Sequence, residues 1–71
     1  MKKISQKLRK LRDAKGYSQE YVAENMGVSS STVSRIETDC SSARVEQLQA
    51  YCDILDITLS ELFGKHSVNP V

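Results

Sequence analysis

Apolar residues recur along this chain at helical spacing, in short runs that polar or glycine-containing segments separate. In residues 4–15, Ile4, Leu8 and Leu11 follow one another at intervals of four and three, which predicts an amphipathic helix. Gly16 is expected to end this helix. The same kind of spacing recurs in residues 18–26, 29–38, 45–55 and 58–63. The sequence therefore predicts an all-α fold of five helices.

The segment 18–38 is expected to form two short helices joined by a tight turn. Gly27 interrupts the apolar spacing, and Ser29 supplies a side-chain oxygen that favours the start of a second helix. Ala23 is small, so we expect the second helix to cross the first at short range. Such a turn is typical of helix-turn-helix motifs, whose second helix enters the major groove of DNA.

Short polar side chains mark the expected starts of three helices. Ser5 is expected to cap the first helix, and Ser18 the second. Thr58 and Glu61 stand three residues apart, which is the spacing of a capping box. We therefore expect a last short helix that begins at Thr58.

The last two helices are expected to complete the core. The apolar face of the helix 45–55 carries Val45, Leu48, Tyr51, Cys52 and Leu55. Leu59, Leu62 and Phe63 either close the core or form a dimer face, and the sequence leaves both roles open. Residues 39–44 are expected to form a polar loop.

The length of the chain suits one small domain. We expect a helix-turn-helix domain at residues 1–63 and a flexible tail at 64–71. No apolar run approaches the ~20 residues that cross a membrane, and the N-terminus lacks the apolar segment of a signal peptide. We therefore expect a cytoplasmic protein with no membrane partner.

Charge is unevenly distributed, although the net charge is only +1. Residues 1–15 hold seven of the ten Lys and Arg residues and one acid, Asp13, whereas residues 16–71 hold three bases and eight acids. A basic first helix by itself is explained by solvation of its surface. Beside a helix-turn-helix pattern, it favours contact with a polyanion such as DNA.

The sequence offers no set of residues suited to catalysis, a metal or a cofactor. Cys40 and Cys52 are far apart, and the single histidine, His66, lies in the predicted tail, which falls short of a set of metal ligands. Cys52 is expected in the core, and Cys40 as an exposed thiol in the loop. We therefore expect neither an enzyme nor a small-molecule ligand.

Three segments carry a resemblance to a known family: KLRKLRDAKGYSQ, then SQEYVAENMGVSSSTVSRIE, then VEQLQAYCDILDITLSELF. From about Ile4 to Phe63 the chain resembles the Cro/repressor-type, XRE-like helix-turn-helix family. The most specific matches in register are Gln19, Ala23, Gly27, Val28, Ser29, Val33, Ile36 and Glu37. The resemblance implies a compact five-helix bundle of the phage-repressor DNA-binding type, with the motif formed by its second and third helices.

The helix 29–38 is the expected recognition helix. Ser30, Ser31, Ser34 and Arg35 share its outer face, and only Arg35 has the length and fork for the acceptor edge of guanine. The family often has longer polar side chains at Ser30 and Ser31, so we expect DNA shape and dimer spacing to supply much of the selectivity. The full set of expected DNA contacts is Arg12, Ser18, Gln19, Ser29, Ser30, Ser31, Thr32, Ser34, Arg35, Ser42 and Arg44.

By the same resemblance, one pair of residues is expected to brace the recognition helix. In the family, an Arg late in the first helix pairs with a Glu at the end of the third, and Arg12 and Glu37 stand at those positions. The resemblance thus implies a structural salt bridge, with DNA contact by Arg12 as the alternative. Gln19 is expected either to contact phosphate or to brace the recognition helix.

The leading hypothesis is a sequence-preferring regulator that binds double-stranded DNA, as a dimeric repressor or autoregulator that reads the major groove with the helix 29–38. Its expected partners are duplex DNA and a second copy of the chain. The alternative is a protein-interaction module on the same fold. The short serine side chains of the helix 29–38 favour it, as does the excess of acidic over basic residues in 16–71. A salt-steep affinity for duplex DNA would distinguish the two.

Overall fold

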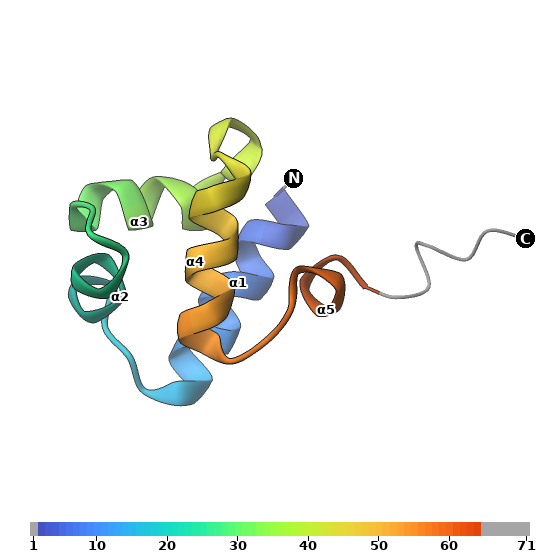
Figure 1. Cartoon of the computed structure of the whole chain (residues 1–71), viewed down its shortest axis with the longest axis horizontal. Helices are drawn as coiled ribbons and strands as arrows, with labels where there is room; N and C mark the ends of the chain where they lie inside the picture. The colour runs from blue at the N-terminus through green and yellow to red at the C-terminus, as the bar shows by residue number, and fades with distance from the viewer. Residues whose placement is uncertain (1, 65–71) are drawn as a thin grey trace, which may run out of the picture.

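The computed structural model describes residues 2–64, which fold into five α-helices and one short 3-10 helix (Figure 1). In chain order the elements are α1 (Lys2–Lys15), α2 (Gln19–Met26), α3 (Ser30–Thr38), η1 (Cys40–Ser42), α4 (Val45–Leu55) and α5 (Leu59–Phe63). No strand occurs in this part of the chain. The predicted all-α class and five helices are confirmed. None of the described helices is both long and apolar enough to cross a membrane.

The helices pack around α1 and α4, which form the middle of the molecule. α2 and α3 pack on each other at one side, and α5 packs against α1 and α4 at the other (Figure 1). The buried apolar core consists of Leu8, Val22, Ala23, Val33, Ile36, Cys40, Leu48, Tyr51, Cys52, Leu55 and Leu62. The α2–α3 pair therefore rests on a scaffold of the other helices, and the outer side of α3 faces solvent.

Most helix ends follow the local chemistry of the sequence. The Ser18 hydroxyl accepts a hydrogen bond from the backbone N–H of Tyr21 at 3.0 Å, which makes Ser18 the N-cap of α2. Thr58 and Glu61 form the predicted capping box, with side chain to backbone distances of 3.0 and 2.8 Å. At the end of α1, Gly16 takes the left-handed conformation (φ 76°) that favours glycine.

The turn between α2 and α3 depends on Gly27, whose φ of 74° lies in the left-handed region. We expect Gly27→Ala to lower the free energy of unfolding by about 1–2 kcal/mol, because an added Cβ strains this backbone. The new Cβ would meet no atom within 4 Å, so the loss measures backbone strain alone. Urea unfolding followed by circular dichroism measures it. Gly27→Asn should lose less, since Asn tolerates this conformation; equal losses for Asn and Ala would contradict the explanation.

The prediction that Ser5 caps the first helix is wrong. α1 begins at Lys2, so Ser5 lies inside the helix on its buried face. The Ser5 hydroxyl accepts a hydrogen bond from the backbone N–H of Cys40 at 2.7 Å. A buried hydroxyl of α1 thus ties the beginning of η1 to α1.

The segment 39–44 also differs from the prediction of a polar loop with an exposed thiol. An Asp39 carboxylate oxygen accepts a hydrogen bond from the backbone N–H of Ser41 at 3.0 Å and caps η1. This turn directs Cys40 into the core, where it is buried. Val45, predicted on the apolar face, is 68% exposed because it is the first residue of α4 and lies beyond the end of the core.

The C-terminal apolar residues differ in burial, which assigns one of them to the core and leaves the dimer face a prediction. Leu62 is buried in the core, whereas Phe63 is exposed. The Lys7 ammonium donates a hydrogen bond to the backbone carbonyl of Glu61 at 2.9 Å, which ties α5 to α1. The predicted tail starts at Gly64, and residues 65–71 with His66 lie outside the described part of the chain.

Candidate nucleic-acid interface

The start of α3 is a cluster of hydroxyl groups. Ser29 is the N-cap, and its hydroxyl accepts a hydrogen bond from the backbone N–H of Thr32 at 3.3 Å. The same oxygen lies 3.0 Å from the Ser31 hydroxyl and 3.1 Å from the Thr32 hydroxyl. α3 therefore begins at Ser30, one residue later than predicted. Its first turn presents donors and acceptors that suit either phosphate or base edges.

The outer face of α3 is open to solvent. Ser31, Ser34 and Arg35 are exposed, whereas Ser30 and Thr32 are half-buried. No carboxylate side chain occurs between residues 30 and 36. This face therefore carries one extended cation among short hydroxyl side chains, an arrangement suited to a polyanionic partner.

η1 lies beside the outer face of α3. A cavity of about 100 Å³ between them is lined by Thr32, Arg35, Ile36, Asp39, Ser42, Ala43 and Gln47. Ser42 and Arg44 are both exposed, at the end of η1 and just before α4. The Arg44 backbone N–H donates to the Gln47 side-chain oxygen at 3.2 Å, which fixes the chain at this point. The structure thus places Ser42 and Arg35, two of the expected DNA contacts, at the same cavity.

Arg12 and Glu37 meet near the C-terminal end of α3, where both side chains are buried. The Arg12 Nε atom lies 2.6 Å from Glu37 Oε2, and Arg12 Nη2 lies 3.1 Å from Oε1, so the contact is bidentate. Arg12 Nη1 donates to the backbone carbonyl of Tyr17 at 2.7 Å. Because Arg12 is only 8% exposed and its guanidinium is bound on both sides, burial does not support the expectation that it contacts DNA.

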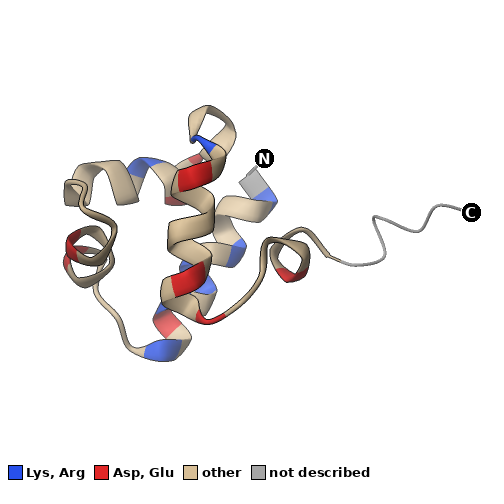
Figure 2. Cartoon of the chain, viewed as in Figure 1, with Lys and Arg blue, Asp and Glu red and all other residues tan. Residues whose placement is uncertain are grey.

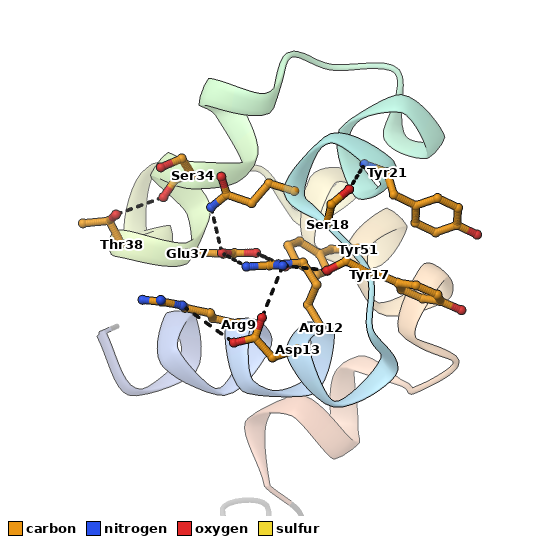
Figure 3. Close-up of polar contacts among 11 residues, drawn as sticks. Arg9, Arg12, Asp13, Tyr17, Ser18, Tyr21, Ser34, Glu37, Thr38 and Tyr51 are labelled. Carbon is orange, nitrogen blue, oxygen red and sulfur yellow. Dashed lines mark hydrogen bonds and ion pairs between the residues drawn. The ribbon is translucent and has the colours of Figure 1, made fainter.

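Two further side chains donate to the same carboxylate. Gln19 Nε2 lies 3.1 Å from Glu37 Oε1, and the Tyr51 hydroxyl donates to Glu37 Oε2. Glu37 therefore receives donors from α1 (Arg12), α2 (Gln19) and α4 (Tyr51), as Figure 3 shows for Arg12 and Tyr51. We call these four residues the Glu37 network. The contact of Gln19 with Glu37 is the one that bracing requires, and phosphate contact by Gln19 stays a prediction.

The hydrogen bonds of the Glu37 network shift the pKa values of Glu37 and Tyr51. Burial alone would raise the pKa of Glu37, but hydrogen bonds from Arg12, Tyr51 and Gln19 outweigh it and hold that pKa below its ordinary value. Burial, and then the hydrogen bond to Glu37, raise the pKa of Tyr51. Glu37 is therefore ionised and Tyr51 protonated at neutral pH.

Sequence reasoning placed Tyr51 on an apolar helix face and missed its hydrogen bond to Glu37. A signal was present, because a tyrosine among Leu48, Cys52 and Leu55 buries a hydroxyl that must find a partner. That partner is Glu37, and the pair meets only because α3 and α4 cross at this point. Helical spacing in the sequence does not predict how two helices cross.

Basic and acidic residues occupy different elements of the fold. Lys and Arg residues are concentrated on α1, and Asp and Glu residues lie mostly on α2, α4 and α5 (Figure 2). The basic and acidic residues that are separated along the sequence are therefore also separated in the fold. Coulomb attraction therefore favours contact of a polyanion with basic α1 rather than with the acidic helices.

Comparison with known proteins agrees with this geometry. Residues 8–62 match a family described as Helix-turn-helix, a match that extends from α1 into α5. No curated protein matches the chain significantly. The family consists of DNA-binding domains that are typically not enzymes. Since the match covers more than half of the chain, and α2, its Gly27 turn and α3 form the motif, this chain belongs to the Cro/repressor-type helix-turn-helix family of DNA-binding transcription regulators.

Proposed function

We propose that the chain is a sequence-preferring regulator that reads the major groove of double-stranded DNA with α3. The observation that supports this most is the contrast between the two sides of α3. Its inner side is buried and its end is held by the Glu37 network, while its outer side presents Arg35 and a row of hydroxyls. A recognition helix must be held rigidly by the rest of the fold and must present an exposed polar face.

Within this proposal the contacts divide into two kinds. Arg35 is the base-reading residue, because a guanidinium fork can bind the two acceptors of guanine. Ser18, Ser29, Ser31, Ser42 and Arg44 are exposed and contact phosphates, which set the register of the protein on the duplex. Ser30, Ser34 and Thr32 complete the contact surface with hydroxyls that tolerate several bases.

We further propose that the protein acts as a homodimer on a palindromic site, as a repressor or autoregulator. Exposed Phe63 on α5 provides apolar surface away from α3, which supports twofold pairing. Half-sites would lie one helical turn apart, about 34–36 Å. The DNA partner also supports the expected cytoplasmic location.

The test is a titration of two labelled duplexes, one of random sequence and one from upstream of the protein's own gene, at several salt concentrations. We expect tighter binding to the upstream duplex and a steep loss of affinity with salt on both. Arg35→Lys keeps the charge but removes the fork, so it should reduce the preference between the duplexes while leaving the salt dependence unchanged.

A matched control is Lys15→Arg, which makes the reverse conservative exchange on an exposed side chain at the end of α1. This variant should keep both affinity and preference. If the parent protein binds neither duplex at low salt, the proposal fails, and the protein-interaction module becomes the better explanation. If Arg35→Lys keeps the full preference, Arg35 is not the base-reading residue.

A further inference from the structure

We propose that the groove between α1 and the C-terminal end of α3 binds a phosphate of the DNA backbone, with Arg9 and Lys10 as its ligands. The groove has a volume of about 590 Å³, and its walls are Gln6, Arg9, Lys10, Asp13, Glu37 and Thr38. This inference rests on the proposed function and adds a second contact site to it. We call this site the α1 groove.

The α1 groove continues the outer face of α3. Thr38 lies one helical turn after Ser34, and its hydroxyl donates to the Ser34 backbone carbonyl at 2.9 Å. Figure 3 shows Arg9 extending from α1 toward this end of α3, with Asp13 beside it. A DNA strand that runs along the exposed side of α3 would therefore reach Arg9 after it passes Ser34 and Thr38.

The charges of the α1 groove favour an anion. Its Glu37 carboxylate is already bound by Arg12, which leaves Asp13 as the acid that faces Arg9 and Lys10. Arg9 and Asp13 have side chains that are 67% and 60% exposed, and Arg9 Nε lies 4.0 Å from Asp13 Oδ2. This distance is too long for a hydrogen bond, so the guanidinium of Arg9 is only loosely held.

Asp13 is an internal competitor for the phosphate. Besides facing Arg9, one of its oxygens lies 3.4 Å from Arg12 Nη1. A phosphate can replace the Asp13 carboxylate at Arg9 and form a bidentate contact that the 4.0 Å pair lacks. Asp13 therefore lowers DNA affinity, and its removal should raise it.

The experiment measures binding to a labelled duplex over a series of salt concentrations. The variants are Arg9→Gln, Lys10→Gln and Asp13→Asn, and the matched control is Lys3→Gln, which removes the same charge from an exposed residue of α1 outside the groove. Arg9→Gln and Lys10→Gln should each reduce the slope of log affinity against log salt by about 0.9. Asp13→Asn should tighten binding roughly twofold to fivefold.

The loss in Arg9→Gln and Lys10→Gln should be similar for random and preferred duplexes, because phosphates carry no base identity. If both variants keep the slope of Lys3→Gln, the α1 groove does not bind phosphate, while the proposed function stands. If the parent protein shows no salt-dependent DNA binding, both inferences fail together. Thermal unfolding of each variant checks that the fold is retained, as exposure of these side chains predicts.

Discussion

Replacing Glu37 by alanine is expected to lower the free energy of unfolding by about 3–5 kcal/mol, because it leaves the Arg12 guanidinium buried without its partner. Both side chains are largely buried, and their contact is bidentate, at 2.6 and 3.1 Å. Gln19 and Tyr51 also lose their acceptor. Urea unfolding followed by circular dichroism gives the free-energy difference.

The control for this change is Glu24→Ala, which removes an exposed carboxylate from α2. Exposed charges contribute little, so we expect this variant to lose less than about 1 kcal/mol. Glu37→Gln keeps the shape and one acceptor oxygen, and it should fall between the two alanine variants. A Glu37→Ala protein as stable as Glu24→Ala would show that the Glu37 network does not stabilise the fold.

The Glu37 network also predicts how the free energy of unfolding falls at acid pH. The folded pKa of Glu37 lies below its ordinary value because hydrogen bonds from Arg12, Tyr51 and Gln19 outweigh burial. Its contribution is therefore complete above the unfolded pKa, about 4.3, and is lost as the pH falls through the folded pKa. Glu37→Gln cannot titrate, so it should lack this part of the acid dependence.

Helix positions could be predicted from the sequence wherever local chemistry decides them. Ser18, Gly27 and the pair Thr58–Glu61 act on backbone atoms within four residues, so their roles follow from sequence spacing. Ser5 shows the limit of this reasoning. A serine near a helix start looks like a cap, but its partner is Cys40, which only the fold brings close.

The candidate site shows the same division. The outer face of α3 could be assigned from helical spacing, because exposure on a short helix follows from the positions of its apolar residues, Val33 and Ile36. The pairing of Arg12 with Glu37 came from a family resemblance, and the structure joins the two residues. Tyr51 and the groove beside Arg9 depend on how α1 and α4 cross α3, which a one-dimensional pattern does not contain.

The Glu37 network connects the stability of the fold to the proposed recognition of DNA. Arg12, Gln19 and Tyr51 come from three helices, and all three donate to one carboxylate near the end of α3. A carboxylate held on several sides has little freedom to move, and therefore α3 keeps its orientation relative to α1, α2 and α4. Loss of one hydrogen-bond donor to Glu37 should make the orientation of α3 less rigid without unfolding the domain.

Tyr51→Phe is the variant that tests this, because it removes one hydroxyl and keeps the buried ring. We expect the free energy of unfolding to fall by about 1.5–3 kcal/mol, the usual contribution of a hydrogen bond to a charged group. The pKa of Glu37 should rise once Tyr51 no longer donates to it, so the acid unfolding midpoint should move to higher pH. Urea unfolding between pH 3 and pH 7 measures both changes, with pH values chosen to bracket about 4.3.

Tyr21→Phe is the matched control, since Tyr21 is exposed and its ring lies 4.5 Å from that of Tyr17 in a contact that needs no hydroxyl. This control should keep the parent's stability and acid midpoint. Combined with Glu37→Gln, the Tyr51→Phe change should have a smaller effect than it has alone, because the partner charge is gone. If Tyr51→Phe alone leaves stability and acid midpoint unchanged, the carboxylate is held by Arg12 and Gln19, and α4 does not help to orient α3.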